Sequence, residues 1–140
     1  MVKKKTNDLM KNLSSDQNLD RYLKENEGEL ISEEISTYLN QLVAARGLKK
    51  TQILKDAEMN EIYGYQIFAG SRKPSRDKLI CLCVGMGLSL EELNQALKYA
   101  GELPLYPRSA RDSVLIAGIL WGDRVMKLNQ ALYDYGFETL

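Results

Sequence analysis

The chain of 140 residues contains no histidine and only two cysteines, and both shortages exclude chemistry. Without histidine there is no Ser–His or Cys–His nucleophile pair, and most zinc sites lose a usual ligand. Cys81 and Cys83 lie two residues apart, so on a helix they point about 200° from each other and cannot form a disulfide there. We therefore expect two buried, small apolar side chains, with no metal and no cofactor.

Long apolar stretches are also missing. No segment approaches the roughly 20 apolar residues of a membrane span, and the start, MVKKKTNDLM, lacks the apolar core of a signal peptide. We therefore expect a cytoplasmic protein without a membrane partner. No acid–base pair can be located among the scattered carboxylates, and no glycine loop follows a strand to hold a phosphate. The sequence predicts a protein that is not an enzyme.

Net charge is zero, from 19 basic and 19 acidic residues, but the charge is unevenly distributed. Residues 49–78 contain seven basic and four acidic side chains, a local excess of +3. The two flanking segments each carry a small acidic excess. A local basic excess is the electrostatic footprint of a polyanionic partner such as nucleic acid.

The rest of the chain is dominated by helical signals, which predict an all-α fold. Apolar residues recur at three- and four-residue spacing, and glycines stand where helices should end. Ser89 with Glu92 forms a capping box, and Asp123 is a plausible cap for the last helix. The expected helices begin and end near residues 33–46, 50–57, 61–69, 76–86, 90–100, 109–120 and 123–135. We expect a polar, partly flexible segment over 1–30, which could form a short helix at 18–26, then a domain over 31–101 and a helical hairpin over 102–140.

An internal repeat occupies the second half of the chain. Residues 76–105 align with residues 111–140 without gaps at a spacing of 35, sharing an initial Arg-Asp, the run LNQAL and two glycines. The glycines stand where a helix must stop, so the repeat unit is interpreted as an αα-hairpin. Two interpretations stay open: duplicated packing, or a pseudo-symmetric surface that pairs with a second protomer or another partner. The surface would use Asn94, Gln95, Asn129 and Gln130 as polar handles, while Asp77 and Asp112 would satisfy backbone N–H groups in the first turn of a helix.

Residues 39–90 resemble the XRE-like helix-turn-helix family of phage-repressor type. The residues that carry the resemblance are Gly47-Leu48, Ile53, Met59, Asn60, Ile67, Gly70, Arg72, Pro74-Ser75, Leu79 and Gly87-Leu88-Ser89. The resemblance implies a lambda-repressor-like helix-turn-helix bundle, here followed by a second αα-hairpin. It also implies a bacterial or phage regulator that binds double-stranded DNA, with a recognition helix over about 61–69 in the major groove.

The resemblance places candidate DNA contacts on two sets of residues. Base-facing positions are Asn60, Glu61, Tyr65 and Gln66, where Gln66 could read adenine and Glu61 could accept from cytosine. Alignment would add Ile62, but Ile62, Tyr63 and Ile67 cluster on one helix face, so we expect Ile62 in the core. The side chains expected to contact phosphate are Lys49, Lys50, Thr51, Arg72, Lys73 and Arg76.

The sequence departs from the family pattern at four positions. Lys50 stands where a glutamine is usual, and Glu58 stands where the turn often has a glycine. Gly64 replaces a buried aliphatic residue at a cost of about 1 kcal/mol relative to alanine inside a helix. Phe68 replaces a usual glutamate. These changes indicate either a shifted recognition helix or a domain released from DNA binding.

Two functions are therefore considered. The first is a DNA-binding regulator that forms a homodimer through its C-terminal hairpin and reads a two-fold operator. The alternative is an all-helical module that binds a protein partner and keeps the helix-turn-helix only as a scaffold. Leu120, Trp121 and Met126 are expected more often in a core than at a dimer interface.

Overall fold

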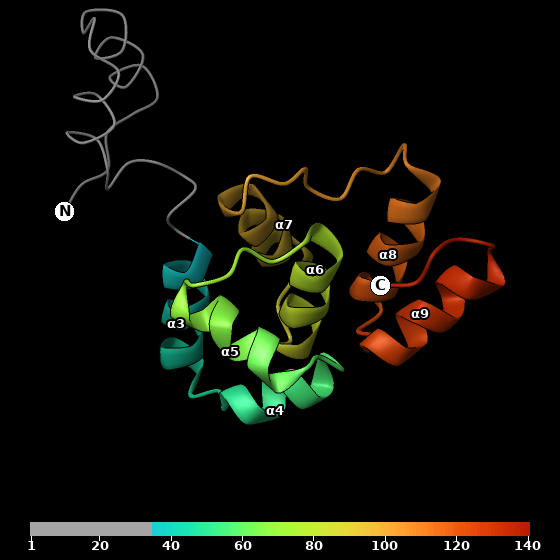
Figure 1. Ribbon diagram of the computed structural model, residues 1–140. Helices are drawn as coiled ribbons and strands as arrows, with labels where there is room; N and C mark the ends of the chain where they lie inside the picture. The colour runs from blue at the N-terminus through green and yellow to red at the C-terminus, as the bar shows by residue number, and fades with distance from the viewer. Residues whose placement is uncertain (1–34) are drawn as a thin grey trace, which may run out of the picture.

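The computed structural model describes residues 35–140, and this part of the chain is all-helical, as predicted. Figure 1 shows α6 and α7 in the middle, with α3–α5 on one side and α8–α9 on the other. The expected segment over 1–30, its helix at 18–26 and the helix start before Ile35 lie outside the described residues. The helices are α3 (Ile35–Arg46), α4 (Lys50–Asp56), α5 (Glu61–Ala69), α6 (Arg76–Gly85), α7 (Leu90–Tyr99), α8 (Ala110–Leu120) and α9 (Val125–Asp134).

Helix starts follow the capping signals in the sequence, with one exception. The side chains of Asn60, Ser75, Ser89 and Ser109 each accept a hydrogen bond from the backbone N–H three residues later, and the Ser89 capping box is complete. The prediction that Asp123 caps the last helix is wrong. The residue before α9 is Arg124, which makes no side-chain cap, because the Asp123 carboxylate instead lies 3.4 Å from Lys127 Nζ.

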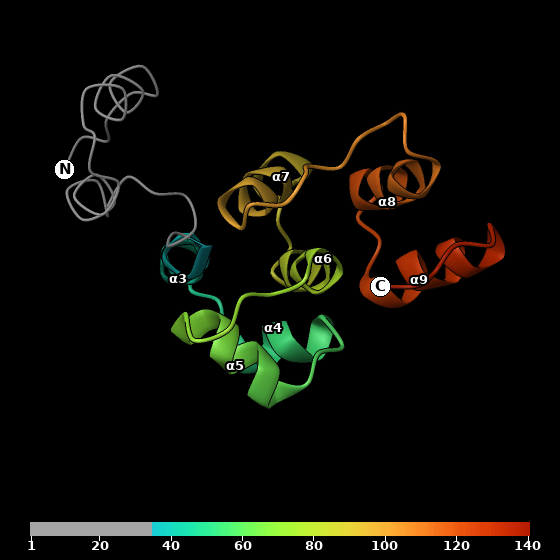
Figure 2. The same ribbon diagram turned by 45° about the horizontal axis from the view of Figure 1, so that its top comes forward.

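The first hairpin, α6–α7, is covered on one face by α3 and α4 (Figure 2). Gly85 permits this contact, because a Cβ atom there would lie 2.6 Å from the backbone oxygen of Ile53 in α4. An ion pair between Arg46 and Glu92 joins α3 to α7. Hydrogen bonds from Arg46, and then from the Ser89 backbone N–H, lower the pKa of the Glu92 carboxyl to about 2.

The two cysteines of α6 belong to this core, as expected. Both side chains are buried and unpaired. Burial raises the pKa of the Cys81 thiol to about 11 and raises that of Cys83 further. Neither thiol is therefore a nucleophile at neutral pH.

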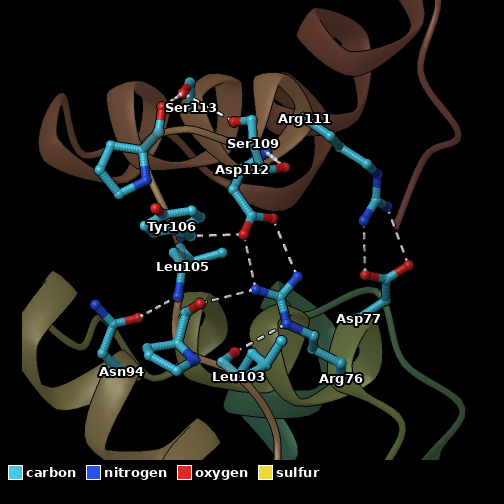
Figure 3. Close-up of polar contacts among 12 residues, drawn as sticks. Arg76, Asp77, Asn94, Leu103, Leu105, Tyr106, Ser109, Arg111, Asp112 and Ser113 are labelled. Carbon is cyan, nitrogen blue, oxygen red and sulfur yellow. Dashed lines mark hydrogen bonds and ion pairs between the residues drawn. The ribbon is translucent and has the colours of Figure 1, made fainter.

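The repeat is confirmed as two αα-hairpins, and they pack against each other with approximate two-fold symmetry. Helix α6 contacts α9, and α7 contacts α8, which is the exchange that a local two-fold axis requires. Arg76 donates two hydrogen bonds to the Asp112 carboxylate, at 3.0 and 2.8 Å. Arg111 donates two to the Asp77 carboxylate, both at 3.0 Å (Figure 3). Since the repeat relates the two arginines and the two aspartates, the ion pairs are exchanged copies of each other.

These contacts correct the interpretation of Asp77 and Asp112 as first-turn acids only. Burial raises the pKa of Asp112, but hydrogen bonds from Arg76 and the Tyr106 backbone N–H outweigh burial and hold the pKa below its ordinary value. Asp112 is the buried charged residue among residues 35–140, and its partner Arg76 is itself only partly exposed. The pair therefore acts inside the contact between the hairpins.

The asparagines of the repeat are structural. Asn94 Oδ1 accepts from the Leu105 backbone N–H at 2.9 Å, and Asn129 Oδ1 accepts from the Leu140 N–H at 2.7 Å. Each asparagine therefore holds the segment that follows its own hairpin. This internal use argues against the expectation that Asn94 and Asn129 act as handles for a partner.

Replacing Glu58 by glycine should stabilise the fold. Glu58 has φ +53°, a left-handed conformation that side chains disfavour and glycine adopts freely. We expect Glu58→Gly to raise the free energy of unfolding by about 0.5–1 kcal/mol, measured by urea denaturation. The control Lys55→Gly, at an exposed position within α4, should lower it by about 1 kcal/mol. A loss of stability in both variants would contradict this reading of the turn.

The two ion pairs should differ in strength. The side chain of Asp112 is 8% exposed and that of Asp77 is 36% exposed. Loss of the arginine partner therefore leaves a more deeply buried carboxylate unpaired at Asp112 than at Asp77. Arg76→Gln should cost about 2–3 kcal/mol of unfolding free energy, and Arg111→Gln less than about 1.5 kcal/mol. Urea denaturation measures both, with Arg108→Gln at an exposed position as the control. Equal losses would show that burial of the aspartate does not set the strength.

Candidate nucleic-acid interface

Helices α4 and α5, joined by the turn 57–60, form the unit that the sequence singled out. Helix α5 has the predicted bounds, beginning after Asn60 and ending at Gly70, which has φ +79°. Its inner side buries Gly64, Ile67 and Phe68. The opposite side is left to solvent, and this outer face is where a groove contact would form.

Gly64 sets how closely the two helices approach. A Cβ atom at this position would lie 2.1 Å from Leu54 Cδ2, so the Leu54 side chain of α4 occupies the space that a larger residue would need. In the sequence, this glycine stands out only as a residue that weakens a helix. A glycine inside a helix can signal close helix packing, but the partner that fills the gap is visible only in the structure.

The expectation that Ile62 belongs to the core is wrong. Its side chain is 71% exposed. At 100° per residue, Ile62 lies roughly 120–160° away from each of the three buried residues of α5. Ile62 was assigned to the core because it is next to Tyr63 on the helix, but Tyr63 is itself only half-buried.

Tyr63 connects α5 to the basic loop 71–75. Its hydroxyl oxygen accepts from the Ser75 backbone N–H at 3.3 Å, and the Arg72 guanidinium carbon lies 5.3 Å from the centroid of its ring. This cation–π contact places Arg72 beside α5. An amphipathic ring suits both packing and polar contact, and Tyr63 combines the two here.

Arg72 also orients Gln66. The guanidinium Nε donates to Gln66 Oε1 at 2.7 Å. An amide oxygen has two lone pairs, so Gln66 can accept a second hydrogen bond while its NH₂ group donates. The pair therefore presents the donor and acceptor that adenine recognition uses, next to a cation that suits phosphate.

The remaining predicted contacts lie on α5, at the start of α4 and in the loop. Lys49, Thr51 and Lys73 are exposed, as are Asn60, Glu61 and Tyr65. Lys50 is only partly exposed, and its Nζ lies 5.0 Å from the centroid of the Phe68 ring. Phe68 thus places its ring against the first lysine of α4.

Arg76 is the exception among the predicted phosphate contacts. Beyond its bonds to Asp112, its guanidinium donates to the backbone oxygens of Leu103 and Pro104, at 3.0 and 3.1 Å (Figure 3). All of these bonds hold the connection between the two hairpins. We therefore assign Arg76 to the hairpin contact and remove it from the DNA-contact set.

Other kinds of site find little support within residues 35–140. No helix in that range is long and apolar enough to span a bilayer, and no three metal-ligating side chains gather there. A cleft of about 660 Å³ lies between the turns of the two hairpins. Four of its charged wall residues pair with each other, Arg46 with Glu92 and Arg124 with Asp56, the latter at 3.3 Å, while Asp123 pairs with Lys127 outside the cleft.

Comparisons with known proteins place no family name on this geometry. No family model matches the chain, and neither a curated protein nor a solved structure matches it.

Proposed function

We propose that the protein is a sequence-specific regulator that binds double-stranded DNA, with α5 in the major groove. The observation that carries the proposal is the Arg72–Gln66 pair on the outer side of α5, because it combines a base-reading amide with a phosphate-binding cation. The resemblance of residues 39–90 to helix-turn-helix repressors supports the same function. A cytoplasmic location and the absence of enzymatic activity are part of this proposal.

The charge of the α4–α5 region favours a polyanion. Arg76 and Asp77 are both used in the hairpin contact, so they cancel from the charge of residues 49–78. Six basic and three acidic side chains then remain, and the local excess is still +3. The exposed cations Lys49, Arg72 and Lys73 flank α5 in sequence on both sides.

The N-terminal part of α5 would read base edges. Asn60 Oδ1 is used by the Tyr63 backbone N–H, at 3.1 Å, so Asn60 keeps mainly its NH₂ group for a base. Glu61 is exposed in the first turn and can accept from cytosine N4. Exposed Ile62 adds an apolar contact of the kind that a thymine methyl group accepts.

The exposure of Ile62 and Tyr65 on one side of α5 also favours a second candidate function. Two exposed apolar side chains on a short helix suit a protein partner as well as a groove. In this alternative, the helix-turn-helix unit is a scaffold and its outer face binds another protein. The salt dependence of DNA binding separates the two functions.

DNA binding should fall steeply with salt and should depend on the α4–α5 cations. We expect the logarithm of the binding constant for random duplex DNA to fall linearly with the logarithm of salt concentration, measured by fluorescence anisotropy. The variant Lys49→Ala/Lys73→Ala should flatten the slope by about two, because two phosphate contacts are lost.

The matched control for that titration is Lys98→Ala/Arg108→Ala. It removes the same charge from exposed positions outside the α4–α5 unit. The control should keep the wild-type slope. If both double variants flatten the slope equally, the α4–α5 unit is not the binding face. If the wild type does not bind duplex DNA at low salt, the regulator proposal fails and the protein-binding alternative takes its place.

A further inference from the structure

The residues that precede α3 are divided by charge. Residues 1–15 contain four basic side chains and one acidic side chain. Residues 16–34 contain two basic and seven acidic side chains, a net charge of −5. We call residues 16–34 the acidic segment. It lies outside the described residues and ends directly before Ile35, the first residue of α3.

The start of α3 lies beside the end of α5 and the basic loop 71–75 (Figure 1). A Cβ atom at Gly70 would lie 3.0 Å from Ser36 Oγ, and Arg72 follows Gly70 by two residues. Consecutive Cα atoms are about 3.8 Å apart, so the last residue of the acidic segment cannot be far from Gly70. The acidic segment is therefore tethered next to the cations of the loop.

An apolar surface and a basic surface are both open within residues 35–140. Leu120, Trp121 and Met126 are between 66% and 78% exposed, which contradicts the expectation that they lie in a core. Met86, the counterpart of Trp121 in the repeat, is buried because α4 packs against the end of α6, where Gly85 allows close approach. No described helix does the same for the second hairpin. A segment with seven carboxylates suits the basic surface and not this apolar one.

We propose that the acidic segment binds the exposed cations that flank α5 in the same chain, and that it thereby competes with DNA phosphate for them. These flanking cations are Lys49, Arg72 and Lys73. The competition with DNA rests on the proposed function. The contact within the chain is argued from charge and position alone.

The acidic segment is long enough to follow α5 from end to end. Its 19 residues can extend to roughly 60–70 Å, whereas the nine residues of α5 span about 14 Å. A short flexible tether gives an effective concentration of millimolar order at the tethered site. Individually weak ion pairs are therefore enough to populate the contact in an appreciable fraction of the molecules.

Duplex DNA can displace a contact of this kind. Ion pairs between exposed side chains are weak and are screened by salt. Binding to DNA also releases the counterions condensed on its phosphates, which favours the complex. The acidic segment therefore lowers the apparent affinity for DNA in proportion to the fraction of molecules whose flanking cations are free.

Fluorescence anisotropy of the full chain with random duplex DNA tests the competition. Glu25→Gln/Glu27→Gln/Glu29→Gln should bind roughly tenfold more tightly than the wild type at about 50 mM salt, because more molecules have free cations. The gain should shrink as salt rises, since salt also screens the contact within the chain. Glu33 and Glu34 are kept, because acidic residues directly before α3 favour the start of the helix.

The matched control is Glu91→Gln/Asp134→Asn/Glu138→Gln. It removes the same charge from exposed positions outside both the acidic segment and the α4–α5 unit. The control should change the affinity by less than about twofold, because charges farther away than a Debye length are screened. An equal gain in both triple variants would show an effect of net charge only and would overturn the proposal. An unchanged affinity of the acidic-segment variant would overturn it as well.

Carbodiimide cross-linking tests the contact without DNA, because the reagent joins a carboxylate to an adjacent amine with no spacer. Mass spectrometry should find links from the acidic segment to Lys73 but not to exposed Lys127 on α9. In a mixture of isotopically labelled and unlabelled chains, the links should join peptides of the same label. Links made only to the lysines of residues 1–15, or only between chains, would overturn the proposal.

Failure of this proposal is distinguishable from failure of the proposed function. Steep, salt-dependent DNA binding by the wild type, without a gain in Glu25→Gln/Glu27→Gln/Glu29→Gln, removes the competition and keeps the regulator. Links to Lys73 in a chain that binds no DNA, with or without the three substitutions, keep the contact and remove the regulator function. Where both stand, duplex DNA in excess should suppress the links to Lys73.

Discussion

The exchange of two arginine–aspartate pairs between the hairpins is the constraint on which the second half of the molecule depends. Arg76 satisfies Asp112 and also binds two backbone oxygens of the connection, so one guanidinium fixes both the contact and the path between the hairpins. Charges removed from water need complete hydrogen bonding to be tolerated, and the bidentate geometry supplies it. The pair therefore specifies one relative orientation of the hairpins, a property that apolar packing alone enforces less strictly.

In the N-terminal half of the described chain, close packing between α4 and α5 fixes the structure, and no buried ion pair is involved. Gly64 lets α5 lie close to α4, and Tyr63 ties the basic loop to the outer side of α5. Arg72 is held against that ring and in turn holds Gln66. A side chain that is already oriented loses less conformational entropy on binding, so these contacts would lower the entropic cost of the proposed DNA binding.

The helices could be predicted because their ends carry local sequence signals. Most of the wrong predictions concern contacts between residues far apart in the sequence. Glu61–Ala69 was predicted correctly because a cap and a terminal glycine mark it. Ile62 was misplaced because a nine-residue helix gives the period too few turns, and its neighbour is only half-buried. Arg76 was assigned to phosphate because a sequence shows a cation but not the carboxylate 36 residues away that binds it. Trp121 was expected in the core because a duplicated hairpin does not reveal that only one copy is covered.

The partners in each arginine–aspartate pair are 36 and 34 residues apart in the sequence, which affects the order in which the chain can fold during synthesis. Helix α6 packs against α7 and α8 packs against α9, so each hairpin can form soon after its own residues emerge. Arg76 and Asp77, however, are made before either of their partners exists. Until α8 has been translated, the first hairpin must keep a cation and an anion hydrated on a surface that will later be enclosed. Arg76 and Asp77 therefore reach their final environment only after the second hairpin has formed.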